Sequence, residues 1–359
     1  MVSTSLVDQV AALRRTYTAE PNTSAAEAVR PVLQRLNRTD RNRVVDALRA
    51  DYDSGVRHPA WTQPSMPDLR ELLLPAAGSA GQRELECGLL DSISSTTNAL
   101  HLRPPASLMR PATVLRRLTI TATGDLNVHV DEPALGPLLT ALLPAPFNGE
   151  QRGVPGLRYR QHKRHGELYL LDAVPAARVI LAAVTAPVAR RALDYVSDDT
   201  GLALDEVQRI LLARHLARSE QDWIEHYGRT VGDPPLGSAL LRRIFALGRP
   251  LWFSTWSTGV RHMLWPAGRA PADVAEQLTH PLLGLPGVYR TDRHDEGITA
   301  LREASSGRVD QHLGLLLRRE SAPTTESDMQ LQSRLRAWEP SVAWQRWSKT
   351  HTAGAGTDQ

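Results

Sequence analysis

Two proline-rich stretches limit the length of the helices that the first third of this sequence can form. They are HPAWTQPSMPDLRELLLP at residues 58–75 and RPPASLMRP at residues 103–111. Proline lacks an amide hydrogen and clashes with the preceding helical turn, so long helices end at such stretches. They predict a helical N-terminal unit over residues 1–57, a proline-rich connector with one helix over 58–111, and a new domain from residue 112.

Apolar residues recur at spacings of three and four in the N-terminal unit and once in the connector. The predicted helices are LVDQVAALRRTY (6–17), SAAEAVRPVLQRL (24–36), RNRVVDALRADY (41–52) and GQRELECGLLDSISSTTNALHL (81–102). Helices of this kind at a chain terminus are more typical of packing or oligomerisation than of a site.

The centre of the chain alternates between polar and apolar residues in the manner of β-hairpins. VLRRLTITATGDLNVHVDE (114–132) is expected to turn at Thr123-Gly124-Asp125, and LRYRQHKRHGELYLLDA (157–173) near His165-Gly166. Each hairpin precedes an expected helix, LGPLLTALLP (135–144) and AARVILAAV (176–184), and a loop is expected at 144–156. The prediction for residues 112–186 is a four-stranded α+β hairpin domain with helices on one face of the sheet.

Residues 188–218, VARRALDYVSDDTGLALDEVQRILLARHLAR, favour two helices that meet at Gly201. Glycine tolerates the left-handed backbone in which many helices end. The small Ser197 would let the helices approach, and four apolar residues would fill the angle between them: Val196, Leu202, Val207 and Ile210.

This spacing resembles the helix-turn-helix motif, over about a tenth of the chain and without a wider family resemblance. The resemblance implies a second helix in the DNA major groove, with Gln208 and Arg209 at base edges. The residues that would face DNA are Ala203, Leu204, Asp205, Gln208, Arg209 and Leu212. The competing interpretation is two ordinary amphipathic helices with Leu204 and Leu212 in a core, since the acidic groups at 198, 199, 205 and 206 would repel phosphate.

Most of the rest of residues 187–320 is expected to be helical, with a short strand and an acidic loop in HPLLGLPGVYRTDRHDEG (280–297). Trp252, Trp256 and Val260 recur at helical spacing, and GITALREASSGRVDQHLGLLLRRES (297–321) resembles a second two-helix unit. The final part, 321–359, carries Trp338, Trp344 and Trp347, which are expected to cover a hydrophobic surface, and a disordered tail from about Thr352.

The strongest cluster of positive charge lies on the second predicted hairpin. Arg158, Arg160, Lys163 and Arg164 stand beside His162 and His165, and alternate residues of a strand share a face. This pattern favours contacts with successive phosphates. A solvated strand edge protected by its charges is the alternative.

No catalytic or metal-binding motif stands out in the sequence. It lacks H-E-x-x-H, G-x-S-x-G and a G-x-x-x-x-G-K-[ST] loop, and its single cysteine, Cys87, excludes an intramolecular disulfide or a cysteine cluster for zinc. No cofactor or metal is expected. Whether the chain is an enzyme stays open, and an active site on the sheet would use His129, Asp131, His162 or Asp172.

The sequence therefore predicts an α+β, predominantly helical protein with a small antiparallel hairpin sheet in the centre, flanked by helical units. Its net charge of +3 permits a nucleic-acid partner without requiring one. No run of about 18 apolar residues would span a bilayer, so a cytoplasmic protein without a membrane partner is expected. The predicted function is sequence-dependent recognition of double-stranded DNA, in regulation or plasmid- or phage-type replication. A non-catalytic scaffold with a protein partner or a homo-oligomer, and an enzyme, are the alternatives.

Overall fold

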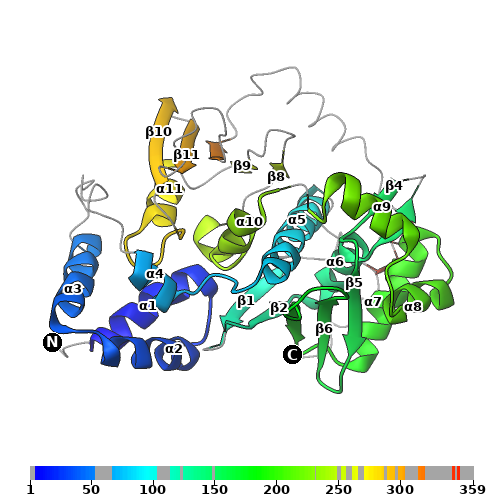
Figure 1. The fold of residues 1–359 in the computed structure, drawn as a ribbon, viewed down its shortest axis with the longest axis horizontal. Helices are drawn as coiled ribbons and strands as arrows, with labels where there is room; N and C mark the ends of the chain where they lie inside the picture. The colour runs from blue at the N-terminus through cyan, green and yellow to red at the C-terminus, as the bar shows by residue number, and fades with distance from the viewer. Residues whose placement is uncertain are drawn as a thin grey trace, which may run out of the picture.

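The fold is α+β and predominantly helical, with two five-stranded sheets (Figure 1). The computed structural model describes residues 5–52, 67–102, 114–121, 124–147, 150–230, 232–248, 252–255, 261–265, 271–286, 289–295, 298–303, 314–319, 342–343 and 346–347.

The three expected N-terminal helices form, as α1 (Leu6–Thr18), α2 (Asn22–Arg35) and α3 (Arg38–Tyr52). Arg14 of α1 is buried and donates from Nε to Glu20 Oε2 at 2.8 Å. Glu20 Oε1 also accepts from the backbone N of Ile120 at 3.0 Å. Through this ion pair and the bond to Ile120, the N-terminal helices contact β1, an edge strand of the central sheet.

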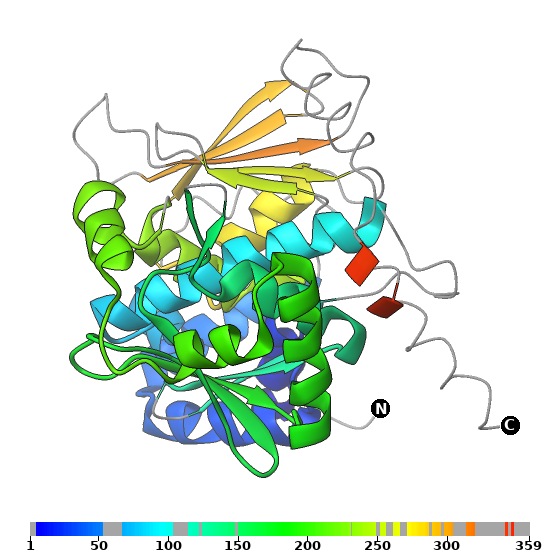
Figure 2. The ribbon, with the colours of Figure 1, turned by 90° about the vertical axis from the view of Figure 1, so that its right-hand side faces the viewer.

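A long helix, α5 (Ala80–Leu102), forms where the connector was expected to hold one, after the short α4 (Pro67–Leu73). Figures 1 and 2 show α5 in cyan between the two sheets. It packs along α10 (Pro234–Leu241), where a Cβ on Gly237 would lie 2.4 Å from Cys87 Sγ. Glycine at position 237 therefore sets how closely the two helices approach.

Glu86 of α5 receives two hydrogen bonds from Arg242, directly after α10, and both side chains are fully buried. Arg242 also donates to the carbonyls of Pro75 and Gly124. These contacts join the connector, the central sheet and the segment after α10 across the predicted boundaries. The hydrophobic core is likewise continuous from Val10 to Trp347.

The central sheet has the strand order β1-β2-β7-β6-β5. Its strands are β1 (Leu115–Ile120), β2 (Leu126–Val130), β5 (Leu157–Gln161), β6 (His165–Leu170) and β7 (Arg178–Ala182). Both expected hairpins form, but β2 and β7 pair in parallel. The sheet is thus mixed, which corrects the antiparallel prediction.

The fifth strand, β7, occupies residues that were expected to form a helix. Its sequence, RVILA, is a short apolar run that fits either period, and here it pairs with strands on both sides. The helix that was expected at 135–144 is present, as α6 (Glu132–Leu142). The loop expected at 144–156 contains a small two-stranded ribbon, β3 (Ala145–Phe147) and β4 (Glu150–Arg152).

A second sheet replaces much of the helical structure expected after residue 250. Its order is β10-β11-β12-β9-β8, and α11 (Pro271–Thr279) packs against β10, β11 and β12. The strands are β8 (Trp252–Thr255), β9 (Arg261–Trp265), β10 (Tyr289–Asp295), β11 (Ile298–Glu303) and β12 (Gly314–Arg319).

The prediction of a second two-helix unit was wrong, because strands β11 and β12 form there. The helical prediction for Trp252 was also wrong, because this residue lies in β8. Trp256, Val260 and Thr123 lie outside the described residues.

The C-terminal segment returns to the α6 side of the central sheet. Trp347 is 6% exposed, donates from Nε1 to the carbonyl of Pro133 at 2.7 Å, and packs on Tyr195 with ring centroids 5.4 Å apart. Trp347 therefore covers a hydrophobic surface as expected. Trp338, Trp344 and the tail from Thr352 lie outside the described residues. In the described part of the chain, no helix combines the length and the apolar character needed to cross a bilayer.

Candidate nucleic-acid interface

The second hairpin projects from the body of the protein. Strand β5 ends at Gln161 and strand β6 begins at His165. The turn therefore comprises residues 162–164, and not His165-Gly166 as predicted. The side chain of Gln161 fixes this turn, because its amide donates to the carbonyls of His162, His165 and Val184. The turn is thereby held to the segment that leads into α7 (Ala186–Thr200).

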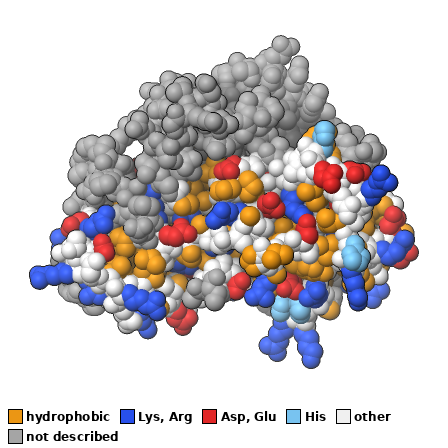
Figure 3. All heavy atoms as spheres, viewed as in Figure 1, with side chains coloured by type: hydrophobic (Ala, Val, Ile, Leu, Met, Phe, Trp, Pro, Cys, Tyr) orange, Lys and Arg blue, Asp and Glu red, His pale blue; other side chains and the backbone are white. Residues whose placement is uncertain are grey.

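The turn carries positive charge into solvent. Lys163 and Arg164 are exposed at its tip, and the imidazoles of His162 and His165 stack with centroids 4.5 Å apart. His162 Nε2 lies 3.2 Å from Glu167 Oε2. Figure 3 shows Lys, Arg and His side chains together on a projection at the lower edge of the molecule, where Figure 1 places the turn between β5 and β6. Two of the predicted phosphate contacts, Lys163 and Arg164, thus share one exposed turn.

Arg158 does not belong to this surface, which corrects its prediction as a phosphate contact. Its side chain is 1% exposed and forms an ion pair with Glu220 of α9 (Arg218–Tyr227). It also donates to the carbonyls of Ala213 and His215. Because β5 is an edge strand, the segment from α8 to α9 packs beside it and covers Arg158. Edge strands are commonly protected in this way.

Glu220 was not expected from the sequence. Burial alone would raise the pKa of its carboxyl, but hydrogen bonds from Arg158 and from the backbone N of Ala217 and Gly156 outweigh burial and lower that pKa. Glu220 lies 62 residues from Arg158, and no local pattern links two positions so far apart. The ion pair therefore stabilises the base of the hairpin and leaves no free charge there.

Arg160 lies two residues after Arg158 on β5, beyond the part of the strand that the α8–α9 segment covers. Its side chain is 59% exposed, and its guanidinium stands 4.8 Å from the centroid of the Tyr169 ring. Glu167 Oε2 approaches Arg160 at 3.5 Å. Arg160 therefore keeps the exposure that a phosphate contact requires, but its charge is shared with a carboxylate.

The expected pair of helices around Gly201 is present, as α7 and α8 (Leu204–Leu212). Gly201 ends α7 in the left-handed region, with φ of 71° and its N–H bonded to the carbonyl of Ser197. The hydroxyl of Ser197 donates to the carbonyl of Leu202 at 2.7 Å. The local turn chemistry that the sequence predicts is therefore confirmed. The use of these helices for binding DNA stays a prediction.

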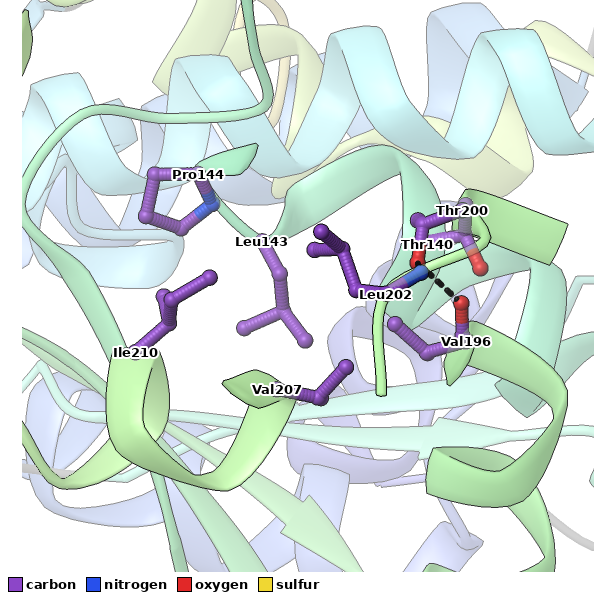
Figure 4. Close-up of a pocket in the computed structure, with 8 residues that line it drawn as sticks. All are labelled: Thr140, Leu143, Pro144, Val196, Thr200, Leu202, Val207 and Ile210. Atoms are coloured by element: carbon purple, nitrogen blue, oxygen red, sulfur yellow. Dashed lines mark hydrogen bonds between the residues drawn. The ribbon is translucent and has the colours of Figure 1, made fainter. Parts of the chain in front are cut away.

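The angle between α7 and α8 is only partly filled. A small, shallow hollow, open to solvent, remains between these helices and the end of α6 (Figure 4). Its lining is mostly apolar and consists of Thr140, Leu143, Pro144, Val196, Thr200, Leu202, Val207 and Ile210. The four residues that were expected to fill the angle do line it.

The outward face of α8 carries both of the predicted base contacts. Gln208 and Arg209 are exposed, and Leu212 is 74% exposed, so this leucine is not the core residue of the competing interpretation. Leu204 is half-buried. Asp205 lies 3.5 Å from Arg209 across one helical turn, with both side chains about three-quarters exposed. The charge on this face is mixed.

The four residues considered for an active site do not form one cluster. Asp131 pairs with Arg116, His162 with Glu167, and Asp172 with Arg229. His129 stands opposite Arg117 on the sheet, and burial first, then the charge of Arg117, lowers the pKa of its imidazole. Among the described residues, no three His, Cys, Asp or Glu side chains come together in a metal-binding group.

Comparison of the chain with protein-family models, with curated proteins and with solved structures gives no significant match.

Proposed function

We propose that this protein binds double-stranded DNA in a sequence-dependent manner, and that the turn between β5 and β6 contacts the phosphate backbone. The observation that carries the proposal is the turn itself, where Lys163 and Arg164 are exposed on a support fixed by Gln161. Because the backbone of this turn is already ordered, binding of its cations to phosphate costs side-chain conformational entropy but little backbone entropy.

The proposed base contacts are Gln208 and Arg209 of α8. Both are exposed on one helix, and these side-chain types pair with the edges of adenine and guanine. Asp205 lies beside Arg209 and would restrain its guanidinium while adding a repulsive charge. We therefore assign affinity mainly to the turn and discrimination between sequences to α8. A role in regulation or in plasmid- or phage-type replication, in the cytoplasm, would follow from such binding.

The test is fluorescence anisotropy with a labelled mixed-sequence duplex across about 50–200 mM salt. Wild type is compared with Lys163→Ala/Arg164→Ala and with Arg30→Ala/Arg35→Ala, which removes two exposed arginines from α2. The proposal predicts a salt slope that is shallower by about two for the turn variant and unchanged for the α2 variant. Equal slopes in all three proteins, or no binding at low salt, would overturn it.

A protein partner is the second candidate, and α9 favours it. Tyr227 is 61% exposed on this helix and packs against Trp223 with ring centroids 4.4 Å apart. Exposed Trp and Tyr side chains are enriched at the centres of protein interfaces. Loss of complex formation on Tyr227→Ala, in a protein that does not bind DNA, would favour this candidate over the first.

A further inference from the structure

The outer face of the central sheet lies opposite the face that packs on the core helices. Apart from Arg158, which the segment from α8 to α9 covers, the outward side chains of this face are half-buried or exposed. Along β6 the buried Leu168 and Leu170 alternate with the half-buried Glu167 and Tyr169. The inward residues belong to the hydrophobic core together with α5 and α6. The strand register places Thr119, Asn127, Ile180 and Glu167 in one row across the outer face, and all four are only half-buried.

The groups that could hold an anionic, aromatic ligand surround Tyr169, in the neighbouring row of this face. Tyr169 pairs with Arg178 of β7, and Arg160 stands over the Tyr169 ring from the other side. Arg178 is 51% exposed and lies 3.5 Å from Asp125. The half-buried Tyr169 ring on β6 thus lies between two strands, β5 and β7, each of which carries an exposed arginine.

A third cation lies at the far side of the same face. Arg117 of β1 is half-buried and stands opposite His129 of β2. Arg160 and Arg117 belong to the two edge strands, which are four strand spacings or roughly 19 Å apart. The cations therefore extend across the whole sheet, as contacts to several successive phosphates require.

We infer that this face binds single-stranded nucleic acid, with the strand running across the sheet and a base stacked against the cluster of Arg160, Tyr169 and Arg178. A duplex hides the faces of its bases, whereas an unpaired strand offers both phosphates and base planes to a flat surface. Guanidinium planes and aromatic rings both stack on bases, and each base has a π face, so this contact needs no particular sequence.

Charge complementarity supports this occupant. The face carries Arg117, Arg160 and Arg178, against Glu167 and Asp125. Glu167 lies within 3.5 Å of both Arg160 and His162, so its charge is already paired. The turn with Lys163 and Arg164 continues the positive surface at one end.

The inference rests on the proposed function in its choice of polymer, but it uses different residues. A duplex held at the turn and an unpaired strand held on the sheet would suit a protein that acts where DNA strands separate.

The experiment measures anisotropy of a labelled oligothymidylate, which does not pair with itself, beside the labelled duplex. Tyr169→Leu is expected to weaken oligothymidylate binding about 5- to 100-fold through loss of one stacked base. Tyr169→Phe keeps the ring and is expected to bind like wild type. Arg117→Gln/Arg178→Gln is expected to reduce the salt slope for oligothymidylate, while Arg30→Ala/Arg35→Ala on α2 leaves it unchanged. Thermal unfolding confirms that each variant is folded.

The outcomes separate the two proposals. Weaker oligothymidylate binding with unchanged duplex binding for Tyr169→Leu supports the inference. If duplex binding is absent but Tyr169→Leu still weakens oligothymidylate binding, the proposed function fails and the inference stands. Absence of oligothymidylate binding by wild type, or equal affinities for Tyr169→Leu and Tyr169→Phe, overturns the inference even if the turn binds duplex.

Discussion

Arg158 and Glu220 form a doubly hydrogen-bonded ion pair that solvent does not reach. The Nη1–Oε1 and Nη2–Oε2 distances are 2.9 and 2.8 Å, and the side chains are 1% and 5% exposed. The pair joins β5, an edge strand of the central sheet, to α9. Arg158 therefore supports the hairpin from within, whereas Lys163 and Arg164 expose their charges at its turn.

Removing one partner of this pair should destabilise the protein strongly. Glu220→Leu or Arg158→Met is expected to lower the free energy of unfolding by about 3–5 kcal/mol, because the remaining charge is buried without compensation. The double variant Arg158→Met/Glu220→Leu should lose much less. Urea unfolding of the four proteins gives the coupling free energy, and additive losses would contradict the structure. Arg158→Met should also leave the salt slope of DNA binding unchanged.

The same pair should make the protein sensitive to acid. Since the folded pKa of Glu220 lies below its unfolded value, its contribution to stability is complete above the unfolded pKa and is lost as the pH falls through the folded pKa. Urea midpoints measured between about pH 6 and pH 3 should therefore fall more steeply for wild type than for Glu220→Gln. Parallel curves would show that Glu220 titrates alike in both states.

Gly201 should be required for its backbone rather than for its size. A Cβ at this position would meet no atom within 4 Å, yet the residue has φ of 71°. Gly201→Ala should therefore cost about 1–2 kcal/mol of unfolding free energy, and Gly201→Asn less, because asparagine tolerates the left-handed region better. Equal stability of the alanine variant and wild type in thermal unfolding would mean that α7 ends differently.

Arg209 and Arg164 should affect DNA binding in different ways. Arg209→Ala is expected to cost about 1–3 kcal/mol on the preferred sequence and little on others. Arg164→Ala should weaken binding to all sequences and reduce the salt slope by about one. Competition with a randomised duplex pool, followed by sequencing of the bound fraction, measures both. Loss of preference in Arg164→Ala alone would assign sequence discrimination to the turn.

Trp347 should hold the C-terminal segment on α6 and α7. Its ring packs on Tyr195, which itself lies against Gly136, where an added Cβ would come within 2.9 Å of the tyrosine ring. Trp347→Ala is expected to cost up to about 3–5 kcal/mol of unfolding free energy. Cleavage after Arg346 by trypsin should become faster in Trp347→Ala than in Trp347→Phe. Equal cleavage rates in both variants and wild type would contradict this docking.

The elements that the sequence predicted correctly are those with long periodic patterns or specific turn residues. The first three helices and α5 repeat apolar residues over several turns, and the hairpins alternate over both strands. The prediction of helices where β8, β9, β11 and β12 lie was wrong because the apolar runs there are short. Ile298 and Leu301, for example, have a helical spacing, although here they lie in β11 between two other strands.

The candidate site was predictable only where exposure follows from local position. Lys163 and Arg164 lie at a hairpin turn, and turns face solvent. Arg158 could not be separated from them, because its burial depends on a helix more than 60 residues away. Arg178 was missed as a surface residue because β7 was taken for a helix, which hid its place beside Tyr169.

The buried contact between Glu86 and Arg242 has a consequence for the protein during its synthesis. The two residues are 156 positions apart, and Arg242 is the later one. At about 5–20 residues per second, the ribosome adds Arg242 roughly 8–30 s after Glu86. Throughout that interval the carboxylate of Glu86, in the first half of α5, has no guanidinium with which to form a buried ion pair. The nascent chain must therefore keep this helix hydrated or shielded by a chaperone until the second half of the molecule emerges.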